Sequence, residues 1–141
     1  MAVKVDGFND IFNVMDNLGD VGKRAGKKAI KSGLEEALGQ LKKDAPVDKF
    51  HSRDKLSIQH IKTNKNGSAW GSCGIGSKNW NDTKQLYFQH YGYENHGLNF
   101  TGQHRIENNV GWIDIAYKKV QKKAEDKIMK TLSSELDKLL K

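Results

Sequence analysis

Three histidines, His90, His96 and His104, lie close together in the sequence and are the first candidates for chemistry. Metal-dependent nucleases use His and Asn at such density, and the neighbouring polar residues are Glu94, Asn95, Asn108 and Asn109. However, the spacing matches neither two ligands at i, i+4 on a helix nor a Cys/His knuckle, and no acidic cluster could hold magnesium. We therefore expect no catalytic residue, no metal and no cofactor, although a small His-dependent nuclease stays an alternative.

Cys73 is the second candidate, as a nucleophile paired with a histidine that the fold would have to bring near it. Gly71, Gly74 and Gly76 surround it and permit close backbone approach, as in an edge strand or a bulge. We favour a small buried strand residue over a nucleophile. Because Cys73 is the single cysteine of the sequence, no intramolecular disulfide can form, and a reducing compartment such as a cytoplasm is expected.

Basic residues are in excess, with 24 Lys and Arg against 17 Asp and Glu and a net charge of +7. Such a balance indicates nucleic acid, an acidic membrane surface or an acidic protein as partner. Lys23, Lys27 and Lys31 recur every four residues, with Arg24 and Lys28 beside them, so they form one basic stripe on a helix. This stripe is a candidate DNA-facing or interface surface; the alternative is an ordinary solvated helix face.

Aromatic residues gather in the middle third of the chain, where they could stack on single-stranded bases or form core and interface. We favour core and interface. The candidate subunit or partner interface consists of Tyr91, Tyr93, Leu98 and Phe100.

The 141 residues suffice for one domain, predicted over 1–141. Apolar residues at helical spacing predict helices over 8–18, 20–44 and 114–140. Strands are expected within 56–92, including a hairpin that turns at Asn66-Gly67 and a third strand at 85–91, and a loop is expected over 93–112. No apolar run is long enough to span a membrane.

These elements predict an α+β fold. An antiparallel sheet of three or more strands would be packed by two N-terminal helices and a long C-terminal helix. The C-terminal helix should bury Val120, Ala124, Ile128 and Leu132.

Several short motifs resemble one family. The chain opens with Gly7-Phe8-Asn9-Asp10-Ile11 and a short helix, and the Lys/Ala-rich helix that follows ends in Lys42-Lys43-Asp44-Ala45-Pro46-Val47. Leu56-Ser57-Ile58 leads into the first strand, Tyr87-Phe88-Gln89-His90-Tyr91-Gly92 gives an aromatic-Gly motif, and Ala116 begins a long charged helix. This layout resembles the head–tail joining or tail-completion (minor tail) proteins of long-tailed bacteriophages.

The resemblance implies a structural virion protein and not an enzyme. Members of that family form rings, often hexamers, at the head-proximal end of the tail, in the neck of the virion. The implied partners are further copies of the chain, the tail tube protein, the head connector or stopper protein and genomic DNA in the lumen, with no membrane. Assembly would take place in the host cytoplasm. The alternative is a small basic nucleic-acid-binding module outside any virion.

Overall fold

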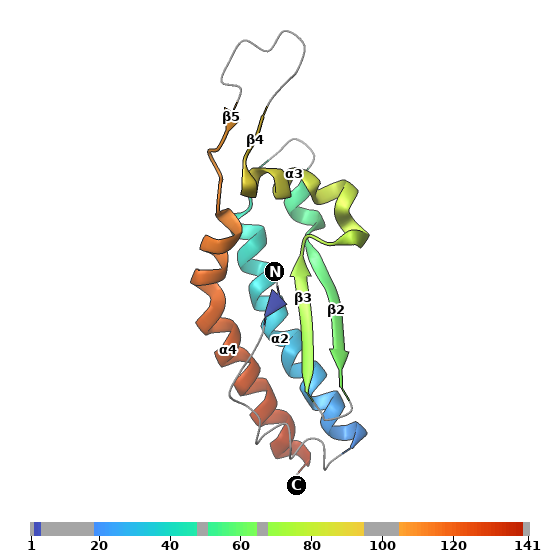
Figure 1. Ribbon diagram of the computed structural model, residues 1–141. Helices are drawn as coiled ribbons and strands as arrows, with labels where there is room; N and C mark the ends of the chain where they lie inside the picture. Colours follow the sequence, from blue (N-terminus) through green and yellow to red (C-terminus); the bar gives the residue numbers. More distant parts are fainter. Residues whose placement is uncertain (1, 4–18, 48–50, 65–67, 95–104, 140–141) are drawn as a thin grey trace.

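Two long antiparallel helices form the body of the protein in the computed structural model, which describes residues 2–3, 19–47, 51–64, 68–94 and 105–139. Helix α2 spans Asp20–Asp44 and helix α4 spans Trp112–Leu139, and the two lie side by side along their length (Figure 1). The sequence predicts helices in both places, because apolar residues recur at spacings of three and four. In α4 the predicted residues Val120, Ala124, Ile128 and Leu132 are indeed buried.

Small residues on α2 let the two helix backbones approach closely. The buried face of α2 includes three glycines and three alanines besides its larger apolar residues: Gly22, Gly26, Gly33, Ala25, Ala29 and Ala37. At Gly33 a Cβ atom would lie 2.5 Å from Cγ1 and 2.6 Å from Cδ1 of Ile128. The Ile128 side chain therefore occupies the space that a larger residue at position 33 would need.

A β-hairpin covers another side of α2. Strand β2, Ser57–Thr63, pairs antiparallel with β3, Ala69–Gly74, with an irregularity between Ile58 and His60. The two residues of β1, Ala2–Val3, pair with the other edge of β3, giving the order β1-β3-β2. At Gly71 a Cβ atom would lie 2.5 Å from Cδ1 of Leu34, so β3 rests almost directly on α2.

Helix α3, Trp80–Tyr91, replaces the third predicted strand. It follows two short 3-10 helices in the chain, η1 at Ser52–Lys55 and η2 at Ser77–Asn79, and lies across one end of the helix pair (Figure 1). Beyond it, β4 at Tyr93–Glu94 pairs with β5 at Arg105–Ile106 within the region expected as a loop.

The predicted fold class is therefore wrong. The described chain is mainly helical, and its sheet is a hairpin with a two-residue edge instead of a broad layer packed by helices. The aromatic run at 85–91 was the reason for the third strand, and that run is helical. The predicted helix at 8–18 and the turn at Asn66-Gly67 lie outside the described residues.

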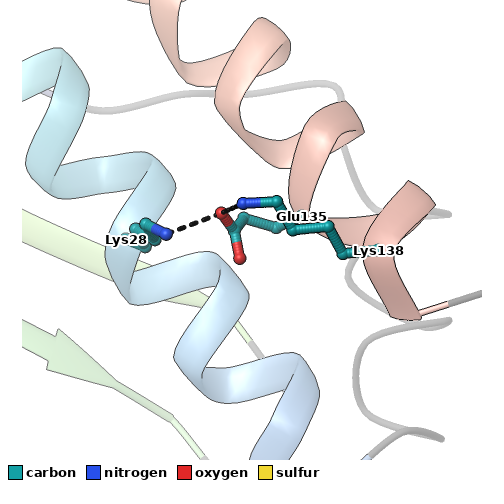
Figure 2. A network of polar contacts seen from close by, with 3 residues as sticks. All are labelled: Lys28, Glu135 and Lys138. Atoms are coloured by element: carbon teal, nitrogen blue, oxygen red, sulfur yellow. Dashed lines mark hydrogen bonds and ion pairs between the residues drawn. The ribbon is translucent and has the colours of Figure 1, made fainter.

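Ion pairs join α2 and α4 near both ends of their contact. At one end Lys28 Nζ lies 2.7 Å from Glu135 Oε1, and Lys138 Nζ lies 3.2 Å from the same oxygen (Figure 2). At the other end Lys119 Nζ lies 3.4 Å from Asp44 Oδ2. The hydrogen bonds from Lys28 and Lys138 lower the pKa of Glu135 below its ordinary value.

Replacing Glu135 by Gln should lower the thermal unfolding midpoint slightly at pH 7, because a carboxylate with a lowered pKa stabilises the fold while it is ionised. This stabilisation is complete above the unfolded-state pKa of about 4.3 and is lost as the pH falls through the lower folded-state pKa. The difference between wild type and variant should therefore close once the pH is low enough to protonate Glu135 in the folded state, and it should shrink in high salt. Asp137→Asn, an exposed acid two positions away, serves as the control; an equal pH dependence in that variant would contradict the assignment to Glu135.

Candidate protein-binding surface

Helix α3 presents four large aromatic side chains to solvent. Trp80 is 37% exposed, Tyr87 39%, Phe88 44% and Tyr91 60%, and we call these four residues the aromatic face. Their rings touch in series, with centroids 5.2 Å apart for Trp80 and Tyr87 and 4.8 Å apart for Tyr87 and Tyr91. Contiguous exposed aromatic rings are typical of surfaces that bind other proteins.

An adjoining side of α3 is buried, although two of its three buried residues are polar. Thr83, Leu86 and His90 recur at spacings of three and four and face the protein interior. Thr83 Oγ1 donates to the backbone carbonyl of Asn79 at 2.8 Å, which satisfies the hydroxyl within the helix. The usual pattern of an amphipathic helix is therefore inverted in α3, because its large aromatic side chains face solvent and two of its three buried side chains are polar.

Asn79 fixes the first end of α3 to the hairpin. Its side-chain Nδ2 donates to the carbonyl oxygens of Lys55 and Gly74, both at 2.9 Å. Its Oδ1 accepts from the amide of Gly76 at 2.8 Å. These hydrogen bonds join η1, the end of β3 and the start of α3, so they hold the first turn of α3, which carries Trp80, in place.

His90 and Trp112 fix the second end of α3 to the start of α4. The Ile113 amide donates to Nδ1 of His90 at 3.3 Å, and the Gly111 amide donates to the His90 carbonyl at 2.9 Å. The indole Nε1 of Trp112 donates to the carbonyl of Leu86 at 3.0 Å. With both ends held, the aromatic face is preorganised, which lowers the entropic cost of binding a partner.

A cavity of about 460 Å³ opens beside the aromatic face. Its walls are mainly apolar and come from α2, the residue that follows η1, the end of β3, α3 and the first turn of α4. Trp80, Tyr87 and Tyr91 line it together with Trp112 and Asp114. Its volume lies within the range of small ligand pockets, about 300–1,000 Å³.

Comparison of the chain with protein-family models, with curated proteins and with solved structures finds no match.

The predicted basic stripe lies on α2 but is not uniform. Arg24, Lys27 and Lys31 are exposed, whereas Lys23 is half-buried and Lys28 is paired with Glu135. Six further lysines are exposed on α4: Lys118, Lys119, Lys122, Lys123, Lys127 and Lys130. The exposed acids Glu35 and Glu36 share a groove with Lys123 and Lys127, so acidic groups interrupt the positive surface.

The predicted interface residues are only partly placed. Tyr91 belongs to the aromatic face, and Tyr93 is half-buried in β4. Leu98 and Phe100 lie outside the described residues. Trp80, Tyr87 and Phe88 were not among the predicted interface residues, and their spacing of seven and eight positions was the signal that could have placed them on one helical face.

The histidines do not form a site within the described part of the chain. His90 is buried and holds the start of α4, whereas His96 and His104 lie outside the described residues. No group of three or more His, Cys, Asp or Glu side chains that could hold a metal is found among the residues that the structure describes.

Cys73 is buried on β3, opposite Ile58 of β2, as expected for a small buried strand residue. Burial raises the pKa of its thiol to about 11, so the thiol is protonated at neutral pH. A protonated, buried thiol is a poor nucleophile.

None of the helices in the described ranges combines the length and the apolar character needed to cross a membrane.

Proposed function

We propose that this protein is a structural subunit that assembles with further copies of itself into a ring at the head-proximal end of a long-tailed bacteriophage tail. In that position the ring completes the tail tube and joins it to the head connector, and DNA passes through its lumen. The observation that carries the assembly part of the proposal is the preorganised aromatic face of α3. The place in the virion is supported by the sequence motifs that resemble tail-completion proteins.

The aromatic face supports assembly because of what the residues are and how they are held. Tyr and Trp supply large contact areas with few rotatable bonds, and residues of this kind dominate the binding energy of protein interfaces. An exposed surface of four contiguous aromatic rings leaves much apolar area in water until a partner covers it. A catalytic surface would instead need polar groups that converge on a substrate.

Introducing negative charge into the aromatic face should disrupt assembly. In the double variant Phe88→Glu/Tyr91→Glu, two carboxylates would be buried in the interface, and the dissociation constant should rise by more than about tenfold. Light scattering coupled to size exclusion and electron microscopy would measure the mass and shape of the particles, alone and with purified phage tails.

The control is Val21→Glu, which places one carboxylate on an exposed apolar position at the far end of α2. It should assemble like the wild type. A wild-type protein that stays monomeric at high concentration and in the presence of tails would overturn the ring. Normal assembly of the double variant would remove α3 from the interface.

The exposed lysines of α2 and α4 favour a second candidate function, a nucleic-acid-binding module. That function predicts that a monomer or dimer binds free DNA with an affinity that falls steeply as salt rises. The ring predicts weak affinity of each separate subunit for free DNA. A salt titration of DNA binding by the double variant separates the two.

A further inference from the structure

We propose that the cavity beside α3 is a binding site for a cationic side chain, an arginine carried on an apolar segment of a partner protein. The inference concerns the cavity itself and does not depend on ring assembly.

Charge is the first reason for a cationic ligand. Asp114, in the first turn of α4, has the one formal charge among the described residues that line the cavity, when His90 is neutral. His90 Nδ1 accepts a hydrogen bond from the Ile113 amide, and a ring nitrogen that accepts carries no proton. Among the ion pairs of the described chain none involves Asp114, and its side chain is exposed at the rim.

Aromatic rings are the second reason. Trp80, Tyr87 and Tyr91 form one wall of the cavity, and the faces of such rings attract cations within about 6 Å of the centroid. Arginine suits this wall better than lysine, because its planar guanidinium stacks on rings while it donates hydrogen bonds to a carboxylate. A cation–π contact occurs elsewhere in the protein, where Lys62 Nζ lies 5.6 Å from the centroid of the Trp70 ring.

An anion is the alternative ligand, because the positive end of the α4 dipole also lies at the cavity. The first two amides of α4, which could bind an anion there, are already engaged. The Trp112 amide donates to the carbonyl of Asn109 at 3.1 Å, and the Ile113 amide donates to His90. Asp114 would in addition repel an anion, so the cavity selects for positive charge.

Apolar walls indicate the kind of segment that carries the arginine. Leu41, Leu56 and Ile75 line the cavity behind the aromatic wall, and they would contact the methylene groups of the arginine side chain and its apolar neighbours. A short peptide with the sequence acetyl-Leu-Arg-Leu-amide reproduces these features. The same peptide with citrulline in place of arginine keeps the shape and removes the charge.

The test is an NMR titration that follows the indole N–H signals of Trp70, Trp80 and Trp112, assigned with single Trp→Phe variants. It uses the full chain carrying Phe88→Asn as well as the wild type. Phe88 belongs to the aromatic face but does not line the cavity, so this variant weakens assembly and keeps every residue of the cavity wall. The arginine peptide should shift the Trp80 signal, and the Trp70 signal, which comes from the hairpin, should stay in place.

The expected effects are specific in size and direction. The citrulline peptide and the Asp114→Asn variant should each weaken binding by about twofold to fivefold, the range for exposed ion pairs and cation–π contacts. Tyr91→Leu should weaken it similarly, and it keeps the test decisive if Asp114→Asn loosens the start of α4. Asp126→Asn, an exposed acid farther along α4, should bind like the parent protein.

Absence of binding to Phe88→Asn protein would overturn the proposal, as would equal binding of the arginine and citrulline peptides. A shift of Trp70 as large as that of Trp80 would also contradict it. If the protein forms no ring but the arginine peptide shifts the Trp80 signal, the cavity is an arginine-binding site and the proposed ring is wrong.

Discussion

Replacing Ile128 by alanine should lower the free energy of unfolding by about 2–5 kcal/mol, the range for buried large-to-small substitutions. Ile128 is 3% exposed at the centre of the contact between α2 and α4, and its side chain occupies the space above Gly33. Chemical denaturation followed by far-UV circular dichroism measures the change. Lys122→Ala, at an exposed position of the same helix, should change stability by less than about 0.5 kcal/mol.

The partner position gives this prediction a second and sharper test. Gly33→Ala places a methyl group against Ile128 and should destabilise the protein by about 1–3 kcal/mol, less the helix-propensity gain of about 1 kcal/mol. Combined with Ile128→Ala, the same methyl group enters the vacated space, so the double variant should be more stable than the sum of the two changes predicts. Gly39→Ala is the matched control: a Cβ there meets nothing within 4 Å, and stability should rise by about 0.5–1 kcal/mol. Strict additivity would contradict the proposed contact.

Gly71→Ala should destabilise the protein at least as much as Gly33→Ala, lowering the free energy of unfolding by about 3 kcal/mol or more. A Cβ at Gly71 would lie 2.5 Å from Leu34 Cδ1 and 2.7 Å from the backbone carbonyl oxygen of His60. The side chain of Leu34 could move, but the carbonyl belongs to β2 and can move only with its strand. We therefore expect β3 to separate from α2 or from β2, which thermal unfolding and loss of near-UV circular dichroism would detect.

Ser72→Ala, one residue along the same strand, is the control for Gly71→Ala. Position 72 already carries a Cβ, so its substitution should cost less than about 1 kcal/mol. Tolerance of alanine at position 71 would mean that the hairpin packs on α2 less closely than the structure shows.

The long helices could be predicted from the sequence because burial sets their pattern. In α2 and α4 the buried positions are apolar or glycine and most of the exposed ones are charged, so spacings of three and four identify both helices. The two strands of the hairpin were recognisable from apolar positions such as Ile58 and Ile61. Hydrophobicity and burial agree in these elements.

Helix α3 could not be predicted in the same way, because hydrophobicity and burial disagree in it. Thr83 and His90 are buried through hydrogen bonds, while Tyr87, Phe88 and Tyr91 are exposed. Reading the aromatic run as apolar and therefore buried gives a strand. For the same reason the candidate surface was only partly found, and the contribution of Asp114 to the cavity depended on a contact between elements far apart in the chain.

Helices α2 and α4 are neighbours in space but are separated in the chain by the hairpin, α3 and β4–β5. During synthesis, α2 and the hairpin leave the ribosome well before α4 is complete. Until then the face of α2 that α4 covers is exposed to water, including the wall around Gly33 that Ile128 later fills. A chain that ends before Trp112 would keep this apolar surface permanently open, which is the property that chaperones and proteases recognise. Helix α4 must therefore be synthesised before the apolar face of α2 can be covered.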